Sequence, residues 1–324
     1  MYFGFTDEQR ELAEVVGSVL DAECSPDVVR AAWTDEPGKL DRRLWDRLVE
    51  LGVAHVVVTE SEGGLGLDER SLVLVLERAG YAGVPLPIVE SALVGPGLLG
   101  ADVAGRLVAT DLGGELVAYA ADADALLLTD GPRLALHDAA SADVQPARAV
   151  DGARRLGEVV LAPYATAVAA VDDPDAIALA YDRLVFGQAA LLVGLAQRML
   201  DLTVGYVTER EQFGVPVGSF QAVKHHCADA LMELAFARPA VYRAAWSLAT
   251  HSPQRSRDVS MAKAMAGDAA VTVARVALQC HGAIAYTVEY DLHLFLKRAH
   301  ALAAADGNSA AHRTRVARLL GLAA

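Results

Sequence analysis

The first hundred residues carry apolar side chains at the three- and four-residue spacing of amphipathic helices. The first such run follows Thr6-Asp7-Glu8-Gln9, which has the form of a capping box at a helix N-terminus. Its apolar positions are Leu12, Val15, Val16, Val19 and Leu20. Similar spacing predicts shorter helices over Leu44–Leu51 and Ser71–Ala79, each followed by glycine or proline signals that end a helix.

The pattern changes between about residues 103 and 171, where short apolar runs alternate with Gly, Asp and Pro and predict a small β region. The runs are Leu116–Ala120, Ala125–Leu128, Leu134–Leu136 and Val159–Leu161. Helical spacing returns after Pro174 and predicts helices over residues 177–211, 219–249, 256–281, 289–303 and 309–321. We therefore expect a mostly α-helical protein with an N-terminal helical domain (1–100), a reduced β domain (101–175) and a C-terminal helical bundle (176–324).

Composition and charge exclude several classes of protein. Of the 324 residues 53% are hydrophobic and only 22% are charged, which excludes intrinsic disorder. The net charge of −14 argues against nucleic-acid and anionic-membrane partners, since both need a basic surface. The three cysteines, Cys24, Cys227 and Cys280, are odd in number and far apart, so we expect buried thiols in a reducing, cytoplasmic protein.

The apolar surplus does not form an uninterrupted run of about 20 residues, the length that spans a membrane. The most apolar stretch, Phe186–Val207, contains Gln188, Gln197, Arg198 and Asp201. The first 14 residues are polar and lack the apolar segment of a signal peptide. Buried helices or a large subunit interface are therefore the expected use of the apolar residues.

Two short motifs favour structural roles. Gly63-Gly64-Leu65-Gly66 lacks the full glycine pattern of a dinucleotide-binding loop, so we interpret it as a turn. His225, His226 and Cys227, with Asp229, contain metal-ligand residue types. Adjacent residues on a helix point about 100° apart, so we expect no metal site there.

The most informative segment is Glu209-Arg210-Glu211-Gln212-Phe213-Gly214-Val215-Pro216-Val217-Gly218-Ser219-Phe220-Gln221. A Gly- and Pro-rich stretch between long helices is ordinarily only a connector. The pattern Arg-x-x-Phe-Gly-x-Pro-x-Gly-x-Phe-Gln, however, resembles the acyl-CoA dehydrogenase family. The resemblance implies that this segment contacts the adenine and pyrophosphate of a flavin (FAD) held by the neighbouring subunit.

A second stretch, Gln279-Cys280-His281-Gly282-Ala283-Ile284-Ala285-Tyr286-Thr287-Val288-Glu289-Tyr290, resembles another run of the same family. Two of the family's glycines are Ala283 and Ala285 here, and alanine allows a less close backbone approach to a ligand. The segments Phe5–Gln9, Gly63–Leu67 and Glu77–Gly80 also match the family's N-terminal helical domain. The resemblance therefore extends over nearly the whole chain, with separated motifs in the expected order.

The middle of the chain departs from the family. The Thr-Glu-Pro-x-x-Gly-Ser-Asp and Trp-Ile-Thr-Asn segments, which hold the flavin ring and part of the thioester in that family, are missing between Pro96 and about Ala125. The resemblance therefore implies a chain that completes a neighbour's flavin site but does not grip a flavin ring of its own.

The family's catalytic carboxylate aligns with Asp306 in the run Asp306-Gly307-Asn308, where most members have Glu. A shorter side chain displaces the carboxylate by about 1 Å, which can cost on the order of 10²-fold in rate. The position that some relatives use instead, after Tyr181-Asp182-Arg183, holds Leu184, which cannot act as a base. An alternative role for Asp306 is to N-cap the last helix.

The resemblance implies a subunit of a heteromeric acyl-CoA dehydrogenase, similar to the α2β2 enzymes of actinobacterial steroid-CoA β-oxidation. In it, Arg210 would pair with the pyrophosphate, and Gln212, Phe213, Phe220 and Gln221 would line the outer part of FAD. Gln279, Gly282 and Ala283 would close over the same part of FAD. The alternatives are a homo-oligomeric enzyme with Asp306 as its base, and a non-catalytic scaffold for a partner subunit.

Overall fold

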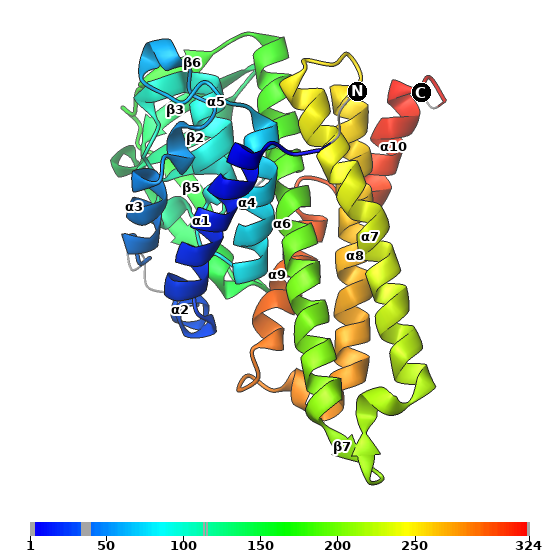
Figure 1. Cartoon of the computed structure of the whole chain (residues 1–324). Helices are drawn as coiled ribbons and strands as arrows, with labels where there is room; N and C mark the ends of the chain where they lie inside the picture. The colour runs from blue at the N-terminus through cyan, green and yellow to red at the C-terminus, as the bar shows by residue number, and fades with distance from the viewer. Residues whose placement is uncertain (1–3, 34–39, 113, 115, 323–324) are drawn as a thin grey trace.

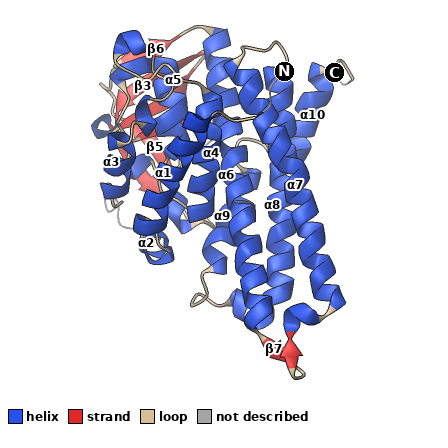
Figure 2. Cartoon of the chain, in the orientation of Figure 1, coloured by secondary structure: helices blue, strands red, loops and turns tan. Residues whose placement is uncertain are grey.

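The computed structural model of the chain describes residues 4–33, 40–112, 114 and 116–322. Long helices dominate the molecule, and a small group of strands lies to one side of them (Figures 1 and 2). The described helices are α1 (Asp7–Glu23), α2 (Pro26–Ala31), α3 (Arg43–Glu50), α4 (Glu69–Ala82), α5 (Gly95–Leu99), α6 (Pro174–Glu209), α7 (Gln221–Ala249), α8 (Arg255–His281), α9 (Leu292–Ala304) and α10 (Ser309–Leu319).

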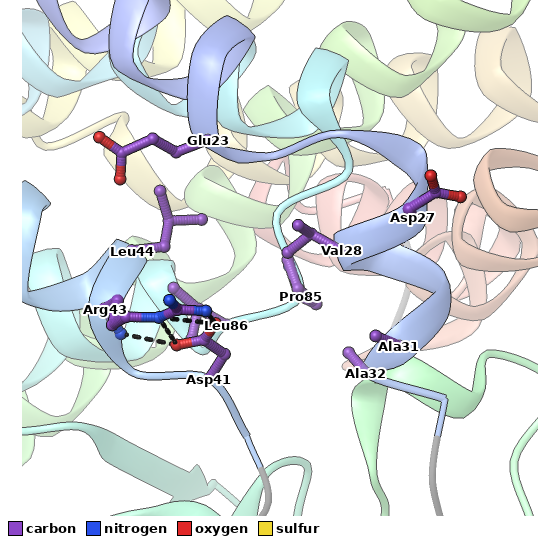
Figure 3. A pocket seen from close by; sticks show the side chains of 10 residues that line it. All are labelled: Glu23, Asp27, Val28, Ala31, Ala32, Asp41, Arg43, Leu44, Pro85 and Leu86. Atoms are coloured by element: carbon purple, nitrogen blue, oxygen red, sulfur yellow. Dashed lines mark hydrogen bonds and ion pairs between the residues drawn. The ribbon is translucent and has the colours of Figure 1, made fainter.

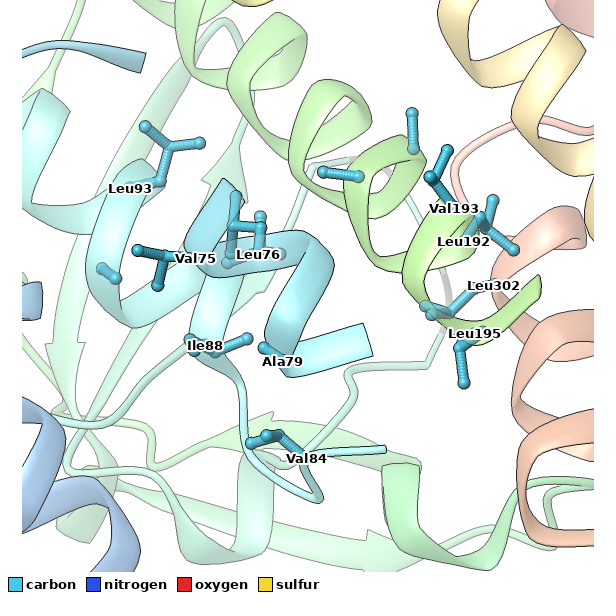
Figure 4. Packing of buried hydrophobic residues seen from close by; sticks show 14 of the residues in the cluster. Val75, Leu76, Ala79, Val84, Ile88, Leu93, Leu192, Val193, Leu195 and Leu302 are labelled. Atoms are coloured by element: carbon cyan, nitrogen blue, oxygen red, sulfur yellow. The ribbon is translucent and has the colours of Figure 1, made fainter. Parts of the chain in front are cut away.

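Helices α6, α7 and α8 run the length of the molecule as a bundle, with the shorter α9 and α10 against them (Figure 1). Helix α4 packs on α6 at very short range because glycines lie at the crossing. A Cβ atom on Gly80 would lie 2.2 Å from the Leu191 carbonyl oxygen, and one on Gly194 would lie 2.0 Å from that of Glu77. Side chains of α4, α6 and α9, among them Leu76, fill the space around this crossing (Figure 4).

The described strands form two sheets in the middle region and a hairpin at the end of the bundle. Their bounds are β1 (Val108–Asp111), β2 (Ala125–Asp130), β3 (Arg133–Asp138), β4 (Ala142–Pro146), β5 (Gly157–Leu161), β6 (Ala169–Val171), β7 (Glu211–Gln212) and β8 (Val215–Pro216). The first sheet has the order β1-β2-β3-β6, in which only the β1–β2 pair is parallel. Strands β4 and β5 form a separate antiparallel pair, as do β7 and β8.

The predicted mostly helical fold with a small β region is confirmed, and the predicted long helices agree with α6 to α10 within a few residues. The capping box is also present. The Gln9 backbone amide donates to the Thr6 hydroxyl oxygen, and the Thr6 backbone amide donates to the Gln9 side-chain oxygen. The predicted strand over Leu116–Ala120 is wrong: only Val117 forms a bridge, to Gly157. Tyr119 has a φ of 61°, which is incompatible with an extended strand. The division into three domains stays a prediction.

By length and composition, α6 could cross a membrane: its most apolar 18-residue window has a mean hydropathy of 1.5. Within the bundle, however, 61% of that window is buried. Phe186 and Met199, on opposite halves of the helix, are fully buried. The apolar surface of α6 therefore forms much of the protein core, which accounts for part of the apolar surplus.

Candidate functional site

The segment predicted to contact a cofactor forms an exposed hairpin at one end of the bundle (Figure 1). Helix α6 ends at Glu209 with Arg210 as its C-cap, and the chain returns so that the Val217 amide donates to the Arg210 carbonyl oxygen at 2.7 Å. The turn between β7 and β8 places Phe213 and Gly214 in the left-handed region, with φ values of 56° and 77°. Glycine adopts this region without steric cost, which explains a Phe-Gly turn at this point.

Aromatic and cationic groups of this hairpin point away from the core. The Phe213 ring is 93% exposed and meets the Phe220 ring edge to face at 6.3 Å between centroids. Arg210 is exposed, and its guanidinium makes no hydrogen bond or ion pair with any described residue. Helix α7 begins at Gln221 without a side-chain cap. The Val223 and Lys224 amides donate to the Phe220 carbonyl oxygen, which leaves the Gln221 and Ala222 amides open at the positive end of the helix dipole.

The second predicted segment lies at the same end of the bundle. Gln279 is exposed in the last turn of α8, which ends at Gly282 with a φ of 64°, and Ala283 is exposed just beyond it. The buried His281 ring stacks on Tyr206 of α6 at 4.5 Å between centroids. The fold therefore brings together two motifs that are about 70 residues apart in the sequence. Ala285 is buried and does not face the surface.

Asp306 lies between α9 and α10, but it does not cap α10. The cap is Asn308, whose side-chain oxygen accepts the Ala311 amide at 3.0 Å, so the capping alternative for Asp306 is wrong. Asp306 has a φ of 51°, and its carboxylate accepts the Gln188 side-chain amide at 2.5 Å. Its backbone carbonyl accepts the Tyr181 hydroxyl at 2.8 Å. The carboxylate is therefore held toward α6.

A buried lysine that the sequence analysis missed lies beside Asp306. Lys263 is 1% exposed, and its ammonium donates to the carbonyl oxygens of Leu302, Ala305 and Gly307 at 2.8, 2.7 and 3.2 Å. Burial lowers the pKa of Lys263 to about 8, and the nearby Asp306 charge opposes this shift. The available signal was a lone lysine among small apolar residues on α8, where a buried ammonium needs several acceptors.

The two groups of predicted site residues are far apart within one chain. Gln188, which binds Asp306, and Arg210, which caps the C-terminus of α6, are separated by 22 residues. At 1.5 Å per residue this corresponds to about 33 Å along the axis. A single flavin therefore cannot contact both groups, and any cofactor at the hairpin lies far from Asp306 of the same chain.

The other motifs singled out in the sequence, within the described residues, do not lie with these candidate site residues. Gly63 and Gly66, with positive φ, form a turn before α4. His225 and His226 are exposed, and no group of three His, Cys, Asp or Glu residues in the described ranges is arranged for a metal ion. The three cysteines are free thiols, of which only Cys24 is fully buried.

A cavity of about 520 Å³ lies beside α2, α3 and the segment after α4, and it is lined mainly by small and aliphatic side chains (Figure 3). Its charged residues include Asp41 and Arg43, which pair with each other. None of the predicted site residues lines this cavity. It does share Leu86 with a cavity of only about 20 Å³ that Gln188 also lines.

Comparison with known protein families finds two matching domains, one at each end of the chain. Residues 6–101 match the family model of the acyl-CoA dehydrogenase N-terminal domain, and residues 178–321 match that of the acyl-CoA dehydrogenase C-terminal domain. The chain is 36% identical over 305 residues to the acyl-CoA dehydrogenase IpdE2 of Mycolicibacterium smegmatis, covering 91% of this chain and 93% of that protein.

Two solved structures have the same fold. The ChsE4-ChsE5 complex of Mycobacterium tuberculosis contains a chain that superposes with a TM-score of 0.87, at 25% identity and 99% coverage of both chains. A chain of the Tcur3481-Tcur3483 steroid ACAD G363A variant superposes with a TM-score of 0.84, at 25% identity over 97% of this chain and 98% of that one. From its two matched domains and its whole-length relatives, this chain belongs to the acyl-CoA dehydrogenase family.

Proposed function

We propose that this chain is one subunit of a heteromeric, FAD-dependent acyl-CoA dehydrogenase, and that the hairpin end of its bundle covers the adenosine and pyrophosphate half of a flavin held by a partner subunit. The observation that carries the proposal is that one hairpin combines the Arg210 guanidinium, which has no partner among the described residues, with the N-terminus of α7, which has no side-chain cap. Arg210 lies about 33 Å along the α6 axis from Gln188, which binds Asp306. These exposed groups have no role in the packing of the isolated chain, which favours a role in contact with a cofactor held by another chain.

The groups at the hairpin fit a pyrophosphate. An arginine forms short, charge-assisted hydrogen bonds with phosphate oxygens, and an open helix N-terminus adds amide donors and a favourable dipole. The 29-residue α7 has such an N-terminus, and Arg210 has no competing carboxylate among the described residues. Gln212, Gln221 and Gln279 are exposed amides that can bond the ribose or adenine.

The surroundings of the hairpin fit coverage by another chain. Large side chains at this end are strongly exposed: Phe213 by 93%, Tyr286 by 78% and Val288 by 63%. On α7, Phe236 and Met232 are exposed by 71% and 56%. We take these exposed apolar side chains, at the hairpin end and farther along α7, as the surface that a partner covers.

In the proposed complex, this chain positions the cofactor and the partner supplies the reacting groups. Once bound, FAD would supply a hydride acceptor for the β carbon of an acyl thioester, and a carboxylate of the partner would remove the α proton. Arg210 and the first turn of α7 hold the pyrophosphate, which fixes the flavin along its length. Phe213 and Phe220 exclude water from the outer half of the cofactor.

Two similar solved structures support the proposed partner and substrate. The similar ChsE4-ChsE5 structure is a complex of two proteins, and the Tcur3481-Tcur3483 structure is of a steroid acyl-CoA dehydrogenase. We therefore extend the proposal to an α2β2 assembly in the cytoplasm that introduces an α,β double bond into a steroid-derived acyl-CoA. Co-purification with the product of an adjacent reading frame, followed by total mass and flavin spectrum, tests the assembly.

Replacement of Arg210 tests the proposed flavin contact. Loss of one charge-assisted contact of about 1.5–3 kcal/mol predicts roughly 10- to 100-fold weaker FAD binding by the Arg210→Ala complex. Arg10→Ala is the matched control, because Arg10 is also exposed but lies on α1. FAD dissociation is followed by flavin fluorescence. An unchanged FAD affinity of the Arg210→Ala complex would overturn the proposed contact.

The alternative is a homo-oligomer in which Asp306 is the base, and the inward position of its carboxylate favours it. Complete loss of turnover in Asp306→Asn, with a normal flavin content of the chain purified alone, would support this alternative. Full activity of a complex changed at both Arg210 and Gln279 would instead indicate a scaffold.

A further inference from the structure

Three aromatic rings from separate elements meet at the end of the bundle that carries the hairpin. Tyr206 is in the last turn of α6, His281 is the last residue of α8, and Tyr290 lies two residues before α9. The Tyr206 and His281 rings stack at 4.5 Å between centroids, with 22° between their planes. The Tyr290 ring lies 5.0 Å from that of His281 and 6.1 Å from that of Tyr206. The cluster therefore joins α6, α8 and the loop after α8.

The hydrogen bonds of His281 determine which of its ring nitrogens carries the hydrogen. Nδ1 lies 2.8 Å from the Ala277 carbonyl oxygen, which can only accept, so Nδ1 is the donor. His281 is 4% exposed, and this burial lowers the pKa of its imidazole, so the neutral form prevails near pH 7. In that form Nε2 accepts, and the Tyr290 hydroxyl donates to it at 3.0 Å. Both nitrogens are paired, which fixes the orientation of the ring.

The bond between His281 and Tyr290 closes the loop that follows α8. The eight residues between them, 282–289, include Gly282 and Ala283, which the proposed function places over the flavin. Most side chains of this loop are exposed and contribute little packing that could hold it in place. Gly282 has a φ of 64°, so the chain turns away from the axis of α8 at that residue. The hydrogen bond therefore holds together the two ends of a largely exposed loop.

The ring stack connects the same histidine to the hairpin. The Tyr206 carbonyl oxygen accepts the Arg210 amide at 2.8 Å, so the residue that supplies the ring also holds the first residue of the hairpin. Gln279 lies two residues before His281 in the last turn of α8. The distance between Arg210 and Gln279 therefore depends on the packing of Tyr206 against His281. The ring cluster lies between the two groups that the proposed function assigns to one flavin.

We propose that His281 is a positioning residue for the flavin contact: stacked on Tyr206 and bonded by Tyr290, it holds the Gln279–Ala283 segment in place relative to Arg210, so that both reach the same cofactor. The buried imidazole acts through this segment and does not touch the flavin itself. The inference rests on the proposed function, because it needs a flavin at this end of the bundle. Loss of the bond or of the stack lets the segment move, which weakens FAD binding although every contacting group is still present.

Tyr290→Phe tests the hydrogen bond, because it removes the hydroxyl and keeps the ring. FAD dissociation from the assembled complex is followed by flavin fluorescence, and thermal unfolding of the same complex is measured as well. The net contribution of a neutral hydrogen bond corresponds to roughly 2- to 10-fold in affinity, so we expect FAD binding to weaken by more than about twofold and by up to about tenfold. A lower Tm with an FAD affinity within about twofold of the wild type would overturn the inference, since the bond would then be only structural.

The matched control is Tyr181→Phe, which also removes a tyrosine hydroxyl that donates a hydrogen bond. Its acceptor is the Asp306 carbonyl oxygen, at 2.8 Å. Tyr181 and Tyr206 are 25 residues apart on α6, which corresponds to about 38 Å along the axis. The FAD affinity of the Tyr181→Phe complex should therefore stay within about twofold of the wild type. Weakening equal to that of Tyr290→Phe would overturn the inference, because it would show an effect that does not depend on position.

A double variant separates positioning from a general loss of stability. If Tyr290 acts through Gln279, Tyr290→Phe weakens FAD binding less in a Gln279→Ala complex than in the wild-type complex, because the positioned group is already absent. Equal weakening in both complexes would overturn the inference. The stack is tested in the same assay. Tyr206→Phe keeps the ring and should bind FAD as the wild type does, whereas Tyr206→Leu should bind it more than about twofold more weakly. Equal affinities of these two variants would also overturn the inference.

Failure of the proposed function is distinguishable in the same set of complexes. If Arg210→Ala and Gln279→Ala both leave the FAD affinity unchanged, the flavin does not lie at the hairpin, and the proposed function and this inference fall together. If both variants weaken FAD binding and Tyr290→Phe does not, the proposed function stands and only the role of His281 is overturned.

Discussion

Replacement of Arg298 by methionine removes a buried guanidinium while it keeps most of the side-chain volume. The Nε–Oδ2 distance to Asp151 is 2.8 Å, and the two side chains are 6% and 1% exposed. Breaking such a buried pair from one side costs about 3–5 kcal/mol, because the remaining carboxylate loses its counter-charge and keeps only the Ala153 amide as a donor. The carbonyl oxygens of Gly83 and Val84 also lose their donor.

The matched control is Arg133→Met, which breaks an ion pair of nearly the same length. Arg133 and Asp130 are 2.7 Å apart, but their side chains are 47% and 56% exposed. Exposed pairs contribute about 0–1 kcal/mol, since water competes for both charges. A double variant, Arg298→Met with Asp151→Asn, removes the unpaired charge and should recover part of the lost stability.

Thermal unfolding of the assembled complex, followed by tryptophan fluorescence, measures the difference. A loss of 1 kcal/mol lowers the Tm by roughly 2–4 °C in chains of 150–250 residues, so Arg298→Met should lower it by on the order of 10 °C. Arg133→Met should lower it by no more than about 4 °C. Equal shifts in the two single variants would refute the reasoning from burial.

Three further predictions concern packing, capping and pH. In Gly194→Ala the new Cβ would lie 2.0 Å from the Glu77 carbonyl oxygen, so this variant should lower the free energy of unfolding by about 1–3 kcal/mol. The control is Gly205→Ala on the same helix, whose Cβ meets nothing within 4 Å and which should not lower the free energy of unfolding. Urea unfolding of both variants measures the difference. Asn308→Ala removes the α10 cap and should cost about 1 kcal/mol in the same assay; no change would show that the cap is dispensable. Burial raises the pKa of Glu90 to about 7 in the folded chain, which means that its contribution to stability is present at low pH and is lost as the pH rises to about 7. Glu90→Gln should therefore gain stability relative to the wild type between about pH 4.5 and 7, and a difference that stays constant over this range would contradict the assignment.

Much of the fold follows from local sequence rules. The period of apolar residues after Pro174 predicts the long helices, because a helix in a bundle must bury one stripe of side chains. The Arg210–Gln221 and Gln279–Tyr290 segments were found as motifs, since glycine and proline at fixed positions determine turns directly. The cap at Asn308 is also a local signal, and the alternative in which Asp306 caps α10 places it two residues too early.

The predicted strand over Leu116–Ala120 is a case in which a local sequence pattern does not determine the backbone conformation. An apolar run is compatible with a strand, but the Tyr119 amide bonds to the carbonyl oxygens of Arg154 and Arg155, which are more than 30 residues away. That contact holds Tyr119 at a positive φ and prevents an extended conformation. Backbone geometry at such a position depends on partners that a local pattern does not contain.

The sequence by itself determined the helical class of this protein, its family and the two motifs that form the end of the bundle. Only the tertiary structure decided that Asp306 binds Gln188, that Lys263 lies beside it, and that Arg298 and Asp151 pair across 147 residues of chain. The physical reason is that helix periodicity and turns depend on neighbouring residues, whereas the pairing of a buried charge depends on which distant segments exclude water from it.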